Sequence, residues 1–159
     1  MKPTKPMPGR RIVHFHPPVG LSTLFRPLPK VKKGMRCTLD ISYQPSKDGP
    51  ALRFSAREAL GIPEQTLLLV LIELAQEQFA AHAKDVVLNA QTENDFGKRL
   101  WSNLNLKNVD ATGETVCVLT TWYELSLRCN SKIGGSGHNQ HKAELRRLCE
   151  VIVWECHQD

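Results

Sequence analysis

The first regular pattern along this chain is an alternation of apolar and polar residues in two short segments. Residues 36–43 and 51–55 both show a period of two, which is typical of strands with one buried face. A Lys-Asp-Gly turn signal lies between the two segments, and we therefore expect a β-hairpin. The residues expected on the apolar face of the first strand are Cys37, Leu39, Ile41 and Tyr43. Before the hairpin, Leu24 and Phe25 offer an apolar anchor that could dock on the folded body.

The middle of the chain predicts a long helix. Pro63 suits a first helical turn, and the helix should run from Glu64 to about His82. Between Leu67 and Leu74 it is apolar on nearly all sides, which indicates a central core helix. The next segments predict a short strand at 86–88, a short helix or extended piece at 98–104 and a strand at 115–119.

Residues 120–155 predict a helix, a glycine-rich turn, a second helix and a strand. Thr121 is a good N-cap, and Glu124 completes a capping box three residues later. Trp122, Leu125 and Cys129 recur at helical spacing and should form the buried face of the first helix. We expect the chain to turn over Asn130 and residues 134–137, because the glycine-rich run does not favour a helix.

The second helix, residues 138–149, is expected to bury one side and expose the other. The side centred on Leu145, with Leu148 and Cys149, should face the core, and a polar side should face solvent. Arg, Asn and Gln are the residue types that pair with base edges in the DNA major groove. The candidate DNA-binding residues are Asn139, Gln140, Arg146, Arg147 and Lys132, with Lys142 directed toward phosphate. An ordinary helical hairpin with a solvated polar face is the alternative.

This order of elements predicts an α+β fold, a winged helix-turn-helix with a small antiparallel sheet. The segment 151–154 would be the first wing strand, and only five residues follow Trp154. The second wing strand would then be missing, so we expect a wing truncated at the C-terminus. The expected organisation is a flexible, basic, proline-rich arm at 1–20, followed by a winged-helix domain at 21–159 that is incomplete at its C-terminal end.

The charge is concentrated at the N-terminus. Residues 1–34 contain eight Lys and Arg and no acid, whereas residues 35–159 contain thirteen bases and sixteen acids, so +8 and −3 sum to the net +5. Such an arm attracts polyanions in general. The five cysteines include no CxxC pair, and we expect thiols in a reducing, cytoplasmic protein. The proline-rich N-terminus does not resemble a secretory signal.

Three segments resemble the plasmid replication initiators of the winged-helix class, the TrfA- and RepC-like proteins. They are Leu24-Phe25-Arg26 before a basic run, the strand pair LDISY and LRFS with the apolar helix after Leu60-Gly61, and TTWYELSLRC followed by KAELRRLCEVIVWE. The similarity covers about residues 21–155, and residues 83–114 match poorly. The resemblance implies a first winged-helix domain that binds double-stranded DNA at repeated origin sequences (iterons), a possible homodimer and possible contacts with host replication proteins. Of the family's DNA-contacting residues, the resemblance assigns to this chain only those on the polar face of the second helix.

The sequence patterns that would indicate catalysis or metal binding are weaker. His14-Phe15-His16 has the form used by rolling-circle nicking enzymes, with Tyr123 or Tyr43 as nucleophile, but Pro17-Pro18 follows at once. A zinc site from His138 and His141 with Cys149, or with Cys156 and His157, matches no standard spacing. We therefore expect no enzyme, metal or cofactor, and tryptophans that serve the core. A transcriptional regulator on the same fold and a pure dimerisation module remain alternative functions.

Overall fold

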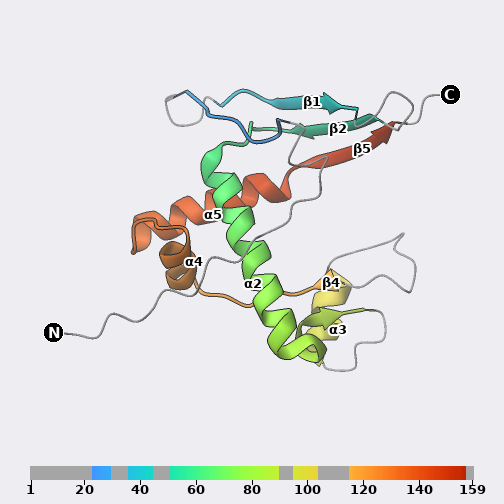
Figure 1. Cartoon of the computed structure of the whole chain (residues 1–159), viewed down its shortest axis with the longest axis vertical. Coiled ribbons are helices and arrows are strands. Elements are labelled where there is room, and N and C mark those ends of the chain that lie inside the picture. Colours follow the sequence, from blue (N-terminus) through green and yellow to red (C-terminus); the bar gives the residue numbers. More distant parts are fainter. Residues whose placement is uncertain (1–22, 30–35, 45–50, 90–94, 104–114, 157–159) are drawn as a thin grey trace. The chain divides into compact units, whose positions relative to one another are not determined.

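The computed structural model describes residues 23–29, 36–44, 51–89, 95–103 and 115–156. These residues form an α+β fold with four helices, a three-stranded antiparallel sheet and a separate pair of two-residue strands (Figure 1). The chain divides into two compact units. The first unit is Met1–Gln65 with Glu144–Asp159, and the second unit is Thr66–Ala143. Helices α2 and α5 contribute residues to both, and each unit is described by itself.

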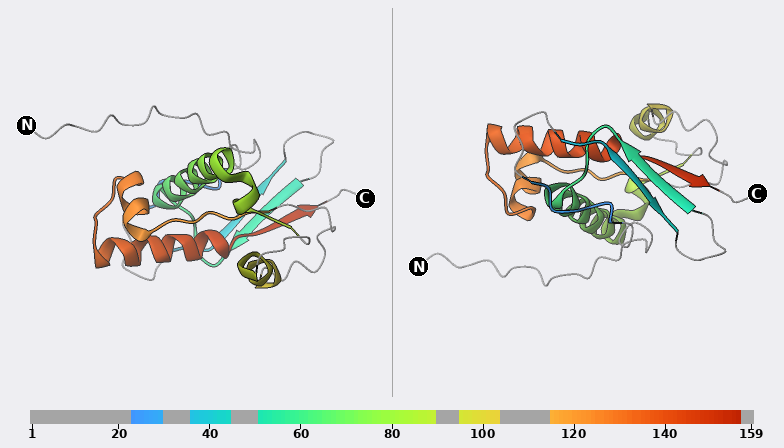
Figure 2. Two further views of the ribbon diagram at one scale, coloured as in Figure 1. Left: turned by 90° about the horizontal axis from the view of Figure 1, so that it is seen from below. Right: turned by 90° about the horizontal axis from the view of Figure 1, so that it is seen from above.

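The first unit contains the three-stranded sheet. Strands β1 (Leu39–Tyr43) and β2 (Ala51–Ala56) pair antiparallel, with Ile41 opposite Phe54, which confirms the predicted hairpin. Strand β5 (Ile152–Cys156) pairs antiparallel with the other side of β2, so the order is β1-β2-β5. The three strands run side by side in each further view, and α5 leads into β5 (Figure 2).

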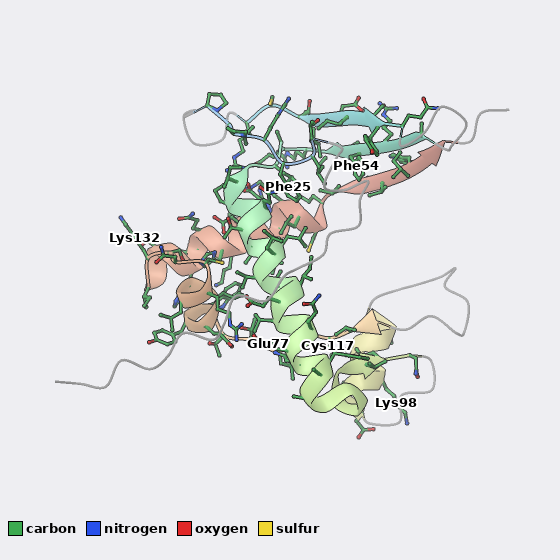
Figure 3. All side chains as sticks on the ribbon, viewed as in Figure 1. Phe25, Phe54, Glu77, Lys98, Cys117 and Lys132 are labelled. Atoms are coloured by element: carbon green, nitrogen blue, oxygen red, sulfur yellow. The ribbon has the colours of Figure 1, made fainter. Side chains whose placement is uncertain are left out.

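The core of the first unit lies on one face of this sheet. Leu24, Leu39, Phe54 and Leu60 are buried together, and Leu148 packs against them. Figure 3 shows Phe25 and Phe54 on the side of the sheet where α2 begins. Phe25 also forms an isolated parallel bridge with Leu60, so the predicted anchor docks as expected. Cys37 is exposed, however, and is wrongly assigned to the apolar face by alternation alone, because β1 begins only at Leu39.

The second unit is built on α2 (Ile62–Val86), which extends four residues beyond the predicted end. Its buried positions Leu67, Val70 and Leu74 recur at helical spacing. The strands β3 (Val87–Leu88) and β4 (Thr115–Val116) pair antiparallel, and α3 (Asp95–Asn103) precedes β4. The predicted strand at 115–119 ends early.

The side chain of Gln78 accounts for the end of this segment. The Leu119 amide donates to Oε1 of Gln78 at 3.0 Å, and Nε2 of Gln78 donates to the Leu119 carbonyl at 2.6 Å. A side-chain amide thus takes the place of a neighbouring strand. Both backbone groups of Leu119 are satisfied without a sheet.

Helix α4 (Trp122–Arg128) follows with the predicted N-cap, but the predicted capping box is only half formed, because Glu124 does not accept from the Thr121 amide. The hydroxyl of Thr121 accepts from the Glu124 amide at 3.2 Å, and the Glu124 carboxylate accepts from the Thr120 hydroxyl at 3.1 Å. We expect Thr121→Ala to lower the free energy of unfolding by about 1 kcal/mol, because one amide of the first turn loses its acceptor. Thr121→Ser keeps the acceptor and should match the parent in urea unfolding. Equal losses in both variants would contradict the capping role.

Candidate nucleic-acid interface

Helix α4 and helix α5 (Gly135–Cys149) are joined by a turn over residues 129–134. Asn130 has φ 50°, in the left-handed region that asparagine tolerates, and Gly134 has φ 120°. The glycine-rich run predicted a helix that begins at residue 138, but α5 begins at Gly135. The expected turn over residues 134–137 is wrong for Gly135 to Gly137, which form the first turn of α5.

The turn is held by close packing against α5. A Cβ on Gly137 would overlap the carbonyl oxygen of Lys132 and lie 3.0 Å from its carbonyl carbon, so only glycine fits. The hydroxyl of Ser131 and Nε2 of His141 form a 2.7 Å hydrogen bond, and His141 is buried. His141 therefore belongs to the packing of the turn. Sequence reasoning missed both contacts, and the helical spacing from 137 to 141 was the signal available.

The buried side of α5 differs from the expectation. Gly137, His141 and Glu144 are buried and Leu148 is half-buried, a spacing of four, three and four residues. The predicted centre at Leu145 is wrong, since Leu145 is only half-buried and Cys149 is exposed. His141 can occupy a core position because its ring nitrogen forms a hydrogen bond with the Ser131 hydroxyl. Glu144 is buried as well.

Most candidate DNA-binding residues nevertheless lie on the exposed side, as predicted. Asn139, Gln140, Lys142 and Arg146 are exposed on α5. Lys132, labelled in Figure 3, is exposed in the turn. The ammonium group of Lys142 lies 5.7 Å from the ring centroid of Trp122, within the range of a cation–π contact. This contact holds the ammonium group of Lys142 beside Trp122 of α4.

Arg147 is the exception, and the prediction that it lies on the exposed face is wrong. Its side chain is 12% exposed, and its Nε donates to Oε1 of Glu64 at 2.7 Å. Its NH1 also lies 3.5 Å from a carboxylate oxygen of Glu58. Arg147 is therefore bound inside the first unit. The helical wheel could not reveal this, because both acids lie more than eighty residues earlier in the sequence.

Glu64 is the centre of a buried ionic cluster in the first unit. Its side chain is fully buried, Arg36 donates to it at 2.8 Å, and the Gly61 amide donates at 2.8 Å. Burial by itself would raise the pKa of Glu64, but the Gly61 and Arg147 hydrogen bonds and the charges of Arg147 and Arg36 hold that pKa below its usual value. The carboxylate thus stays ionised and fixes the first turn of α2.

Three of the five Lys and Arg residues in 120–149 are paired with acids. Arg147 is bound as described, and Arg146 lies 3.3 Å from both Glu58 and Glu150. In the second unit, Arg128 donates to Glu77 at 2.7 Å, and this hydrogen bond is the main cause of its raised pKa. Within the described ranges, Lys132 and Lys142 are the two cations of this segment without an acidic partner.

Among the described residues, neither the candidate nicking-enzyme site nor the candidate zinc site is assembled. His14, His16 and His157 lie outside the described residues. Tyr43 packs against the core of the first unit, and Tyr123 is exposed on α4. In the described ranges, no group of three or more His, Cys, Asp or Glu side chains is placed to hold a metal ion.

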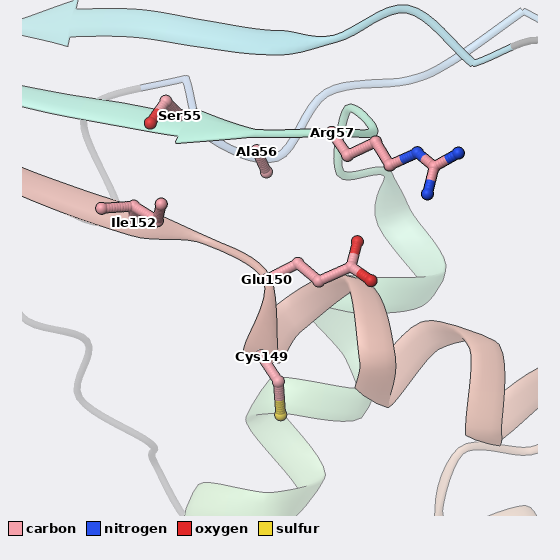
Figure 4. Close-up of a pocket in the computed structure, with 6 residues that line it drawn as sticks. All are labelled: Ser55, Ala56, Arg57, Cys149, Glu150 and Ile152. Atoms are coloured by element: carbon pink, nitrogen blue, oxygen red, sulfur yellow. The ribbon is translucent and has the colours of Figure 1, made fainter.

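One hollow of about 560 Å³ opens in the first unit where β5 begins (Figure 4). Arg57 and Glu150 bring opposite charges to its wall, and Ala56 and Ile152 bring apolar atoms. This mixed lining does not select a small charged ligand.

Two of the tryptophans can be compared with the predicted core role. Trp122 is half-buried, but Trp154 is 55% exposed, so the prediction is wrong for Trp154. Its Nε1 donates to the Ser55 hydroxyl at 3.3 Å along the sheet. The side chain of Trp101 lies outside the described side chains.

No protein-family model, no curated protein and no solved structure matches this chain. None of the helices in the described ranges has the length and apolar character needed to cross a membrane.

Proposed function

We propose that this chain binds double-stranded DNA, with the N-terminal half of α5 in the major groove. The observation that carries the proposal is the character of residues 129–143. This segment contains no Asp or Glu, and it presents Lys132, Asn139 and Lys142 to solvent together with the start of a helix. Amide side chains read adenine edges, and lysines bind phosphates as point charges.

The order α4, turn, α5 and β5 supports a winged helix-turn-helix as the architecture behind this activity. In that architecture the second helix of the pair enters the groove. The proposed contacts therefore come from Asn139 and Gln140 to bases and from Lys132 and Lys142 to the backbone. Arg146, which is bound by two acids, is at most a secondary phosphate contact, and Arg147 is not part of the proposed surface.

The test begins with affinity selection from a pool of random-sequence double-stranded DNA. Asn139→Ala should weaken binding to the selected sequence by about 1–3 kcal/mol and relax preference at one position. Lys132→Ala should weaken selected and unselected DNA equally and reduce the slope of log K against log salt by about 1. Lys98→Ala is the matched control, since Lys98 is an exposed lysine of the second unit on α3 and should change neither quantity.

Equal effects of Lys132→Ala and Lys98→Ala would show that only general charge attracts DNA, and would contradict the proposal. Thermal unfolding of each variant separates lost contacts from lost folding. We further propose, from the resemblance to plasmid initiators, that the bound sequence is an origin repeat. Several copies of the selected sequence beside a replication origin would support this role, whereas one site at a promoter would favour the transcriptional regulator.

A further inference from the structure

Strand β5 leaves apolar residues and one edge of the sheet uncovered. Among the described residues it pairs only with β2, so its second edge offers unpaired backbone groups (Figure 2). Ile152, Val153 and Trp154 are consecutive there and are exposed by 53%, 55% and 55%. Proteins usually protect such an edge with charges, proline, a bulge or a covering segment. We therefore expect a further segment to cover β5.

The cover has to reach both faces of the sheet. Val153 is opposite the buried Phe54 and lies on the core face, yet it is more than half exposed. Ile152 and Trp154, one position away on either side, lie on the opposite face. A strand paired along the edge covers side chains on both faces, whereas a ligand that rests on one face leaves some of them in water.

One segment of this chain has the composition of such a strand. Residues 11–16 read Arg-Ile-Val-His-Phe-His, and β-branched and aromatic residues are those that favour strands. The segment lies within residues 1–34, which carry eight Lys and Arg and no acid, whereas β5 carries Glu155 and no Lys or Arg. Its charge and its apolar residues therefore both complement β5.

The path of the chain selects the direction of the added strand. Leu24 belongs to the buried cluster against which Val151 packs, so the chain enters the described fold beside the start of β5. An antiparallel strand places His16 at this end, where Pro17-Pro18 then stop the pairing. A parallel strand would require residues 17–22 to return along all five residues of β5, about 17 Å, which is nearly their full reach of about 20 Å.

One antiparallel register matches the faces of the segment to the faces of β5. With Val13 opposite Val153, Val13 and Phe15 share the core face, and both histidines lie on the other face. Pairs of opposite charge, and pairs of an aromatic with a β-branched residue, are favourable across strands. The opposed pairs in this register are Arg11 with Glu155, Ile12 with Trp154, Val13 with Val153 and His14 with Ile152.

The neighbouring registers lose these matches. A shift by one residue in either direction turns Phe15 away from the core face and brings His14 onto it. A shift by two residues opposes an arginine to Val153 in one direction and an acid to Val13 in the other. Each of these registers places a polar or charged group against apolar surface.

We propose that residues 11–16 add to the free edge of β5 as a fourth, antiparallel strand of the same sheet, with Val13 opposite Val153. All of these residues belong to the first unit. The added strand closes the exposed edge, and residues 1–10 then leave the sheet at the far end of β5, in place of the flexible arm expected from composition. The pairing is independent of DNA binding, because it uses no residue of the proposed DNA-binding surface.

Disulfide trapping in the full chain tests the strand and its register. Val13→Cys with Val153→Cys should form an intramolecular disulfide with oxidised glutathione, because directly opposed residues bring their Cβ atoms within about 4.5–5.5 Å. Ile12→Cys with Val153→Cys should react at least about tenfold more slowly, since these two positions lie on opposite faces in the proposed register. Electrophoresis without reductant and peptide masses identify the bond. The background replaces three cysteines with serine, namely Cys37, Cys149 and Cys156.

Three outcomes of the trapping would overturn the proposal. A faster reaction of the Ile12→Cys pair would show another register. A disulfide that joins two chains would show that a second copy covers β5. The absence of a disulfide from both pairs would show that residues 11–16 do not reach this edge.

Exchanging the charges of Arg11 and Glu155 tests their predicted pairing. In the chain with Val13→Cys and Val153→Cys, Arg11→Glu should slow disulfide formation about threefold or more, because like charges directly opposite each other are unfavourable. Adding Glu155→Arg should restore the parent rate. Lys5→Glu is the matched control, since it makes the same change in net charge outside the paired segment and should leave the rate unchanged. Equal slowing by Arg11→Glu and Lys5→Glu would show only a general attraction of basic residues, and would contradict the assigned pair.

Discussion

Replacing Glu64 with glutamine is expected to lower the free energy of unfolding by about 3 kcal/mol. The carboxylate is fully buried and accepts from Arg36, Arg147 and the Gly61 amide. Glutamine keeps the volume but leaves two guanidinium groups beside a neutral partner. The cost falls at the lower end for a broken buried ion pair, because Arg147 retains Glu58 as a second partner. Urea unfolding, followed by circular dichroism, measures the loss.

Asp40→Asn is the matched control for this prediction. Asp40 binds Arg53 through two hydrogen bonds of 2.9 and 2.8 Å, which resembles the Glu64 cluster in geometry but not in burial. Both side chains are more than half exposed, and exposed ion pairs contribute only about 0–1 kcal/mol. Similar losses in the two variants would show that hydrogen-bond geometry, and not burial, sets the cost.

The same cluster makes stability depend on pH in a defined direction. Because the pKa of Glu64 is lower in the folded than in the unfolded chain, its contribution is complete above the unfolded value of about 4.5. The contribution is lost as the pH falls from there through the folded value. The stability difference between the parent and Glu64→Gln should therefore be constant near neutral pH and shrink below about pH 4. A difference that grows on acidification would contradict the assigned ionisation.

Local sequence signals predicted most of the regular structure. The hairpin follows from alternation with a turn signal, α2 from its proline and apolar content, and α4 from the Thr121 cap. Each of these signals acts within a few residues of the element it specifies. The winged-helix arrangement itself depends on contacts between distant segments, and it stays a prediction.

The errors in the predicted site arise from such distant contacts. Arg147 was expected in solvent because its charge is visible in the sequence, whereas its partner Glu64 is distant in the sequence and close only in the fold. Cys149 was expected in the core because helical spacing places it on the same side as Leu145 and Leu148, but it is exposed. The exposed positions of Asn139, Lys142 and Lys132 were predicted, since polar residues without a buried partner remain in water.

The start of α5 shows why a glycine-rich run is ambiguous. Glycine is a poor helix former, which favours a turn, yet it is also the only residue that permits very close backbone contact. At Gly137 the second property decides, because the Lys132 carbonyl occupies the space of a Cβ. We therefore expect Gly137→Ala to destabilise the chain by about 3 kcal/mol, the upper end of typical overpacking costs, despite the better helix propensity of alanine.

Gly135→Ala separates space from propensity at the same helix start. A Cβ at Gly135 would meet nothing within 4 Å, so this variant should be neutral or more stable by up to about 1 kcal/mol. The loss in Gly137→Ala should also weaken DNA binding, because moving the turn displaces Lys132 relative to Asn139. Paired urea unfolding curves and DNA titrations of the two variants measure both effects. If Gly137→Ala unfolds like Gly135→Ala, then the turn yields freely and the close contact does not position the proposed DNA-binding helix.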